Sequence, residues 1–159
     1  MSRMPLMIAI AALFPLTTVA ARTPPAPTAQ HNVAVNADAD ELALHGYDAV
    51  AYFADGVPTR GDARFAATYD GARYQFSTDA HRQAFAADPA RYAPQFGGFC
   101  ALGTAYGEKV DTDPETGKVV DGKLYLNNSK KVAELWETDR SDYIAKADFA
   151  WLTIKDKAP

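Results

Sequence analysis

The chain has 159 residues, of which 48% are hydrophobic and 23% are charged, and its formal net charge is -4. This length suits one domain with a modest core and is too short for two ordinary domains. The composition is typical of a globular protein. The acidic balance gives no overall basic field that would hold a nucleic acid, so we expect no nucleic-acid partner.

The N-terminus has the plan of a secretory signal peptide. Arg3 precedes an apolar run over residues 6–20, and small residues end this run. The run is short for a membrane span, and Pro15 interrupts it. We therefore predict that residues 1–21 are a signal peptide and that the protein is exported, periplasmic or secreted, with no stable membrane span after cleavage. An uncleaved N-terminal anchor is the alternative.

Residues 22–40 are rich in proline, alanine and polar residues and lack a sustained apolar period. This composition is typical of a flexible linker. His31 lies in this segment and is interpreted as an ordinary tail histidine. Residues 41–152 are predicted to form the domain, and residues 153–159 a tail.

The domain is predicted to begin with a short helical turn over residues 48–53, for which Asp48 is a suitable N-cap. His45 lies just before this turn, next to Gly46. The imidazole of His45 is interpreted either as a surface or capping side chain or as a third ligand of a metal site.

A hairpin and a helix are predicted next. Asp70-Gly71 lies between two short aromatic-rich runs, which indicates a tight hairpin turn. Residues 78–87 suit a helix that Ser77 or Thr78 caps. Asp88-Pro89 is expected to end this helix, because proline cannot continue it.

The best candidates for functional side chains are His81 and Cys100, which is the only cysteine of the chain. Ser77 and His81 are four residues apart where the helix begins, so both side chains are expected to face one side. Gly97-Gly98 precedes the apolar residues 99–103, for which we predict a strand that runs close to the helix of His81. One cysteine cannot form an internal disulfide, so in an exported protein it is buried, metal-bound, reactive or paired between molecules.

The C-terminal part is predicted to contain a second hairpin and two helices. The acidic residues 111–117 resemble the start of a calcium loop but lack its glycine and its final glutamate, so we predict a solvated turn. Asp121-Gly122 predicts the hairpin turn, and Ser129 is a suitable cap for the helix after it. Residues 141–151 carry an apolar stripe that predicts a last helix. The sequence shows no internal repeat.

Three motifs follow one another along the chain: GYDAVAYF at residues 46–53, GGFC at residues 97–100 and DGKLYLN at residues 121–127. With these motifs the chain resembles the YHS domain family, in particular its exported single-domain branch, which is distantly related to TRASH-type metal-binding modules. The resemblance extends over about residues 42–151.

The resemblance implies a small α+β domain, in which a β-hairpin followed by a helix forms a treble-clef-like core, with a second hairpin and C-terminal helices. In the metal-binding relatives, cysteines occupy the positions that align with Ala51, Ser77 and His81. Only His81 keeps a good metal donor, and Cys100 belongs to the pattern of the exported branch.

Our first hypothesis is a metal site. A cysteine thiolate with an imidazole suits copper, which we favour, or zinc. The predicted ligands are Cys100 and His81, with His45, Asp48 or a second molecule completing the site. Two protein ligands do not make a closed tetrahedral zinc site.

Two hypotheses without a metal stay open. In the first, His81 is a hydrogen-bonded helix residue, Cys100 is a small buried side chain, and the protein is a binding module whose partner the sequence does not identify. In the second, Cys100 is a nucleophile and His81 its base, which requires an exposed thiol with a lowered pKa. No thiol-enzyme signature surrounds Cys100, so we predict no catalytic residue.

Overall fold

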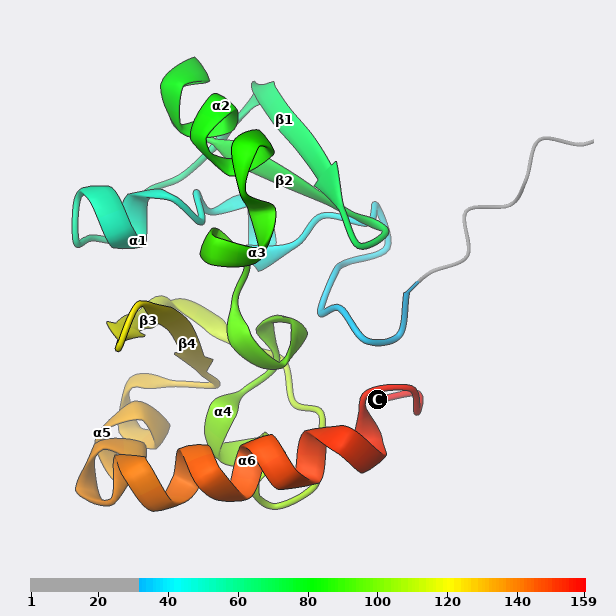
Figure 1. Ribbon diagram of the computed structural model, residues 1–159, viewed down its shortest axis with the longest axis vertical. Helices are drawn as coiled ribbons and strands as arrows, with labels where there is room; N and C mark the ends of the chain where they lie inside the picture. The colour runs from blue at the N-terminus through cyan, green and yellow to red at the C-terminus, as the bar shows by residue number, and fades with distance from the viewer. Residues whose placement is uncertain (1–31) are drawn as a thin grey trace, which may run out of the picture.

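The computed structural model describes residues 32–159, so the predicted signal peptide, His31 and the first part of the predicted linker lie outside the described residues. The described chain forms an α+β fold of two units, one above the other in Figure 1. The first unit consists of η1 (Leu44–Gly46, a 3₁₀ helix), α1 (Ala51–Ala54), β1 (Asp62–Tyr69), β2 (Ala72–Phe76), α2 (Asp79–Ala87) and α3 (Pro89–Tyr92). The second consists of η2 (Gln95–Gly98, also 3₁₀), α4 (Ala101–Ala105), β3 (Asp113–Val120), β4 (Lys123–Asn127), α5 (Lys130–Thr138) and α6 (Arg140–Ile154).

The first hairpin forms where the sequence predicts it. Asp70 and Gly71 both have positive φ angles, 53° and 79°, as a tight two-residue turn between antiparallel strands requires. In β2, alternate side chains point inward, and Ala72, Tyr74 and Phe76 are buried. The hairpin therefore presents one apolar face to α2.

The helix α2 is held at both ends by side chains. At its start, the Thr78 hydroxyl accepts a hydrogen bond from the backbone N–H of His81 at 3.1 Å. At its end, Asp88 leaves the helical conformation and caps α3 by accepting from the backbone N–H of Arg91. Between these ends, Phe85 is fully buried, with its ring 4.7 Å from that of Tyr74.

The second unit repeats the first, so the expectation of no internal repeat is wrong. Its two strands and the helix after them have the same lengths as their counterparts, 8, 5 and 9 residues. Each begins 51 residues later, as Asp113 begins β3 and Asp62 begins β1 (113 − 62 = 51). The recurring signals are few: an Asp-Gly turn, a hydroxyl cap and an aspartate that ends the helix. Because so few positions need the same residue, the repeat does not show in the sequence.

Two predicted elements differ from the structure. Residues 111–117, predicted as a solvated turn, lie mostly in β3, which pairs with β4. Residues 99–103 form no strand, because Phe96, Gly97 and Gly98 adopt positive φ angles of 54°, 61° and 86° and turn the chain into α4.

The domain also extends beyond its predicted bounds. Val35, in the predicted linker, is buried in the core. The Lys109 ammonium donates hydrogen bonds to the backbone oxygens of Val33 and Lys155, which ties the segments before residue 41 and after residue 152 to one side chain. The packed fold of the described residues therefore continues on both sides of the bounds predicted at residues 41 and 152.

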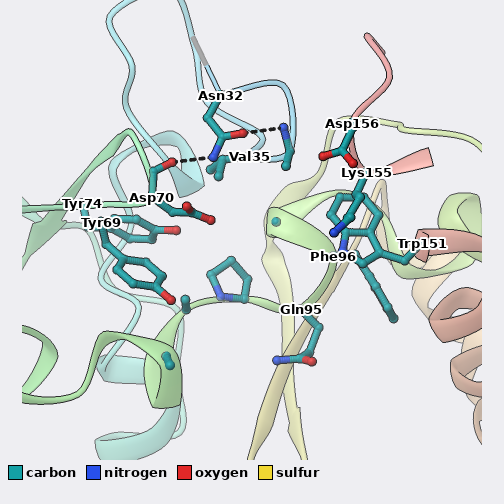
Figure 2. A pocket seen from close by; sticks show the side chains of 15 residues that line it. Asn32, Val35, Tyr69, Asp70, Tyr74, Gln95, Phe96, Trp151, Lys155 and Asp156 are labelled. Carbon is teal, nitrogen blue, oxygen red and sulfur yellow. Dashed lines mark hydrogen bonds between the residues drawn. The ribbon is translucent and has the colours of Figure 1, made fainter. Parts of the chain in front are cut away.

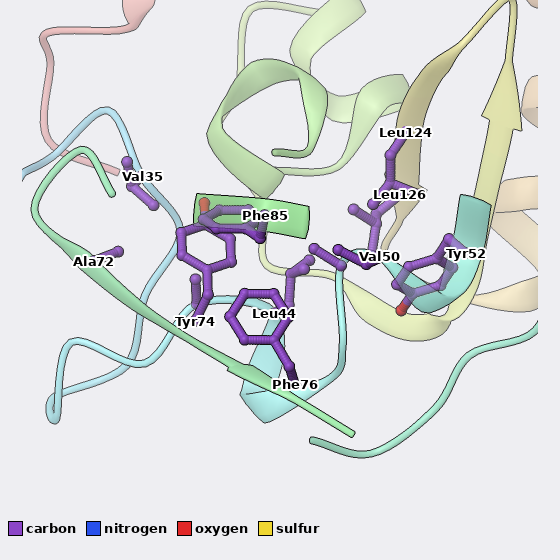
Figure 3. Close-up of a cluster of buried hydrophobic side chains, with 12 residues drawn as sticks. Val35, Leu44, Val50, Tyr52, Ala72, Tyr74, Phe76, Phe85, Leu124 and Leu126 are labelled. Atoms are coloured by element: carbon purple, nitrogen blue, oxygen red, sulfur yellow. The ribbon is translucent and has the colours of Figure 1, made fainter. Parts of the chain in front are cut away.

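The hydrophobic core has two centres. The first, drawn in Figure 3, surrounds Phe76 and Phe85 and also receives Leu124 and Leu126 from β4, so it joins the two units. The second surrounds Trp136, between α4, α5 and α6. Among residues 32–159, no helix is long and apolar enough to cross a membrane.

Candidate functional site

The carboxylate of Asp48 is the polar centre of the first unit, and its side chain has no exposed surface. Its Oδ1 accepts hydrogen bonds from the backbone N–H groups of Val50 at 2.9 Å and Ala51 at 3.2 Å. These bonds cap the start of α1, as the sequence predicts for Asp48.

The second oxygen of Asp48 reaches the junction of β2 and α2. Oδ2 accepts from the backbone N–H of Ser77 at 2.8 Å, from the Ser77 hydroxyl at 2.6 Å and from His81 Nδ1 at 2.7 Å. Because a carboxylate only accepts hydrogen bonds, Nδ1 of His81 must carry the hydrogen. The His81 side chain is 17% exposed, and its Nε2 makes no hydrogen bond within residues 32–159.

The residues at the relatives' ligand positions do not fit a metal ion. Ala51 has no donor atom, and both the Ser77 hydroxyl and His81 Nδ1 are directed at the Asp48 carboxylate. Within the part of the chain that the structure describes, no group of three or more His, Cys, Asp or Glu side chains could hold a metal ion. A buried carboxylate with five hydrogen-bond donors occupies this place instead.

Cys100 lies in the other unit, at the position that corresponds to Asp48. The backbone N–H of Cys100 donates to the oxygen of Val110, as the N–H of Asp48 donates to the oxygen of Thr59. The thiol sulfur accepts from the backbone N–H of Gly103 at 3.4 Å and lies 3.7 Å from Oδ1 of Asn127. Cys100 is thus the cap of α4, as Asp48 is the cap of α1.

The structure does not bring Cys100 and His81 together. Their hydrogen-bond partners differ, and they begin helices in different units, α4 and α2 (Figure 1). The Cys100 side chain is buried, and no histidine is among its hydrogen-bond partners within residues 32–159. The thiol thus has no imidazole base among these partners, although Cys100 lines a pocket with Leu102 and Tyr106.

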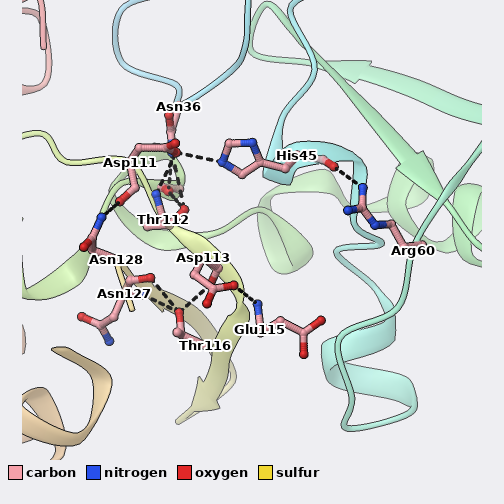
Figure 4. Close-up of polar contacts among 11 residues, drawn as sticks. Asn36, His45, Arg60, Asp111, Thr112, Asp113, Glu115, Thr116, Asn127 and Asn128 are labelled. Atoms are coloured by element: carbon pink, nitrogen blue, oxygen red, sulfur yellow. Dashed lines mark hydrogen bonds and ion pairs between the residues drawn. The ribbon is translucent and has the colours of Figure 1, made fainter. Parts of the chain in front are cut away.

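His45, the third predicted ligand, lies in yet another place (Figure 4). Its Nε2 is 2.9 Å from Oδ1 of Asp111, so it forms a contact between the two units. Burial raises the pKa of Asp111, but hydrogen bonds from Asn36, from the backbone N–H of Thr112 and from His45 together outweigh it and hold this pKa below its ordinary value. His45 is therefore engaged by a carboxylate and is not a neighbour of Cys100 in this hydrogen-bond network.

Sequence reasoning named Asp48 as a helix cap and as one group that could complete a site with His81, but it did not derive their direct hydrogen bond. The signal in the sequence was the four-residue spacing of Ser77 and His81. This spacing places two hydrogen-bond donors on one face of the helix, so a nearby acceptor could have been predicted. Sequence reasoning also missed a cavity of about 460 Å³ between the units, which Tyr74 lines from β2 and Trp151 from α6. A cavity of this size is in the range of small-molecule sites.

A scan against protein families matches residues 50–96 to the YHS domain. The match runs from the start of α1 into η2, so it includes Ser77 and His81, whereas η1 and Asp48 lie just before it. Searches of curated proteins and of solved structures found no match to the chain.

Proposed function

We propose that this protein, whose residues 50–96 match the YHS domain, is a metal-independent binding module and not an enzyme. The observation that carries this proposal is the saturation of Asp48 by five hydrogen-bond donors at the place where metal-binding relatives hold their ligands. The predicted export, to the periplasm or outside the cell, is part of the proposal.

The Asp48 cluster supplies the cross-link that a metal ion supplies in a treble-clef-like site. One side chain joins the start of α1, the residue after β2 and the first turn of α2. Buried hydrogen bonds to a carboxylate are stronger than bonds between neutral groups, because the site excludes water. The unit therefore needs no ion to hold these three segments together.

Copper or zinc binding is the second candidate, and one observation favours it. A histidine whose Nδ1 donates to a carboxylate presents an oriented Nε2, which is the usual arrangement of metal-ligating histidines. In this protein His81 has that orientation, with Asp48 as its partner. Since Cys100 and His45 have other partners, the remaining ligands would come from a second molecule or from solvent.

Metal content and stability together test the proposal. We expect protein purified without chelator to hold less than stoichiometric metal by elemental analysis, and its unfolding midpoint to be unchanged by EDTA. Titration with Cu(I) and with Zn(II) should give the same weak binding in wild type, His81→Ala and Cys100→Ala. Stoichiometric tight binding that either substitution abolishes would overturn metal independence and establish the second candidate.

Export needs its own measurement. We expect the mature protein, expressed with its full N-terminus in a bacterial host, to be recovered outside the cytoplasm and to begin near residue 22 by N-terminal sequencing. An intact N-terminus on protein recovered from the cytoplasm would contradict export and would leave the metal question untouched.

A further inference from the structure

The cavity between the two units has walls of different character (Figure 2). One wall comes from the first hairpin and carries Tyr69, Asp70 and Tyr74. The other comes from η2 and the end of α6 and carries the rings of Phe96 and Trp151. A molecule in this cavity would therefore contact polar oxygen atoms on one side and aromatic rings on the other.

Tyr74 is a buried residue whose hydroxyl faces the cavity. Its side chain is only 2% exposed, yet its hydroxyl makes no hydrogen bond within residues 32–159 and points into the cavity in Figure 2. Burial raises the pKa of Tyr74 far above its usual value, and the nearby Asp70 carboxylate adds to this effect. The phenol is thus neutral at physiological pH, and its oxygen can accept a hydrogen bond. No residue of 32–159 uses the hydrogen-bonding capacity of this hydroxyl, so a molecule in the cavity can use it.

The charge of the cavity favours a cation. The carboxylate of Asp70 forms no ion pair and no hydrogen bond within residues 32–159, since only the backbone oxygen of Asp70 is bonded, to Asn32. The cavity contains a second carboxylate, Asp156, and one ammonium, Lys155. The Lys109 ammonium lies beside Asp156 and over the Trp151 ring, so the two lysines offset Asp156 on this wall. The carboxylate left for a cation is that of Asp70 on the hairpin wall.

We propose that this cavity binds a small organic amine with an apolar or aromatic body. The protonated amine donates to the Asp70 carboxylate and to the hydroxyl oxygens of Tyr69 and Tyr74, and the body of the ligand lies against Phe96 and Trp151. This inference rests on the proposed function, because it gives the metal-independent module a class of ligand.

Three probes of equal size test the charge requirement: 2-phenylethylamine, 2-phenylethanol and phenylacetate. We measure their binding to EDTA-treated protein by titration calorimetry and by NMR shifts of the cavity residues. Since hydrogen bonds to charged groups are strong, we expect the amine to bind at least about tenfold more tightly than the alcohol or the acid. Equal binding of the three probes, or no binding of the amine, would overturn the proposal.

Two conservative variants test the residues. Asp70→Asn keeps the fold, because asparagine tolerates the positive φ angle of 53° at this position. Tyr74→Phe removes only a hydroxyl that bonds to nothing within the described residues. We expect amine binding to weaken about tenfold or more in Asp70→Asn and about threefold to tenfold in Tyr74→Phe.

The internal repeat provides matched controls. Asp121→Asn and Tyr125→Phe are the same substitutions at the corresponding positions of the second hairpin. Neither residue lines the cavity, and Tyr125→Phe keeps the ring that packs 5.9 Å from that of Phe96. We expect both control variants to bind the amine as the wild type does. Equal weakening in the controls and the cavity variants would overturn the site.

The amine test and the metal test are independent, because the protein is free of metal in these titrations. Failure of amine binding does not bear on metal independence, and a bound metal found by elemental analysis does not bear on the cavity.

Discussion

The Asp48 carboxylate and the His81 imidazole come from residues 33 positions apart and meet at 2.7 Å between Oδ2 and Nδ1. The contact joins the cap of α1 to the first turn of α2, so one buried carboxylate fixes the relative position of two helices through its two oxygens. It also fixes the orientation of the imidazole and leaves Nε2 without a hydrogen-bond partner among residues 32–159. The stability of the first unit and the chemistry available to His81 therefore depend on the same contact.

We predict that Asp48→Asn destabilises the protein by about 3–5 kcal/mol, the usual cost of removing one partner from a buried charged contact. The amide of asparagine has one acceptor oxygen, and its NH₂ group would face N–H and O–H donors of Val50 and Ala51 or of Ser77 and His81. Urea unfolding at pH 7 measures the change.

Asp79→Asn is the matched control for this prediction. Asp79 lies on the same helix as His81, but its carboxylate is exposed and bonds only to Arg82 and Gln83. We expect its unfolding curve to lie close to that of the wild type, because exposed ion pairs contribute little. If Asp48→Asn were as stable as Asp79→Asn, the buried contact would have no role in holding α1 to α2.

The local signals in the sequence predicted the hairpins and the helix caps. Asp70-Gly71 and Asp121-Gly122 adopt the positive φ angles that a tight turn requires, and Thr78 and Ser129 accept from backbone N–H groups as caps. These features depend on residues within four positions of one another, so a short stretch of sequence determines them. The α+β class follows from the same signals.

The candidate site could not be predicted in this way, because its contacts join distant residues. His45 and Asp111 are 66 positions apart, and no local pattern pairs them. Cys100 was expected beside His81 because the glycines before it suggested a strand. The positive φ angles at Gly97 and Gly98 turn the chain into α4 instead, and this places the thiol in the second unit.

The contact between His45 and Asp111 predicts loss of stability in acid. Hydrogen bonds hold the pKa of Asp111 below its ordinary value in the folded protein, against the effect of burial. The folded state therefore binds fewer protons than the unfolded state when the pH is near the unfolded value of about 3.9. This contribution is fully present above that value and is lost as the pH falls through the folded pKa. We expect the urea midpoint of the wild type to drop in this range.

Asp111→Asn isolates this contribution from other acidic groups. Asp62, whose pKa is lowered to about 2 by its hydrogen bonds with Arg64, is present in both proteins and cancels in the comparison. We expect Asp111→Asn to be less stable than the wild type at pH 7 and to approach it as the pH falls to about 2. Parallel curves for the two proteins over this range would show that Asp111 does not titrate differently on folding.

Lys109 predicts that the two ends of the described chain are stabilised together. Its ammonium donates to the backbone oxygens of Val33, Lys155 and Lys157 and lies 5.5 Å from the ring centre of Trp151. Lys109→Met keeps the length of the side chain and removes these bonds. We expect hydrogen exchange to accelerate at least about tenfold at residues 33–36 and at residues 155–157, since each bond to a charged group stabilises the closed form.

Lys118→Met is the control for Lys109. Lys118 forms an exposed ion pair with Glu137 on the second unit, remote in sequence from both ends. We expect its substitution to leave exchange at residues 33–36 and 155–157 unchanged. Acceleration at only one of the two segments in Lys109→Met would contradict the coupling of the two ends through this side chain.

Gly97 provides a test of whether the segment before residue 41 belongs to the fold. Gly97 has a φ angle of 61°, and a Cβ atom at this position would lie 1.8 Å from the backbone oxygen of Ala34. Neither backbone can move freely, because the N–H of Asn36 donates to the oxygen of Gly97 at 2.8 Å. We predict that Gly97→Ala lowers the free energy of unfolding by about 3 kcal/mol or more, from the left-handed backbone and the overlap together.

Gly107→Ala separates the two causes, since Gly107 has a φ angle of 82° but nothing within 4 Å of its added Cβ. Its expected cost is the left-handed term alone, about 1–2 kcal/mol. Urea unfolding measures both variants. An equal cost in the two variants would mean that residues 32–37 yield to the added atom, and the domain would then begin at the predicted boundary and not before it.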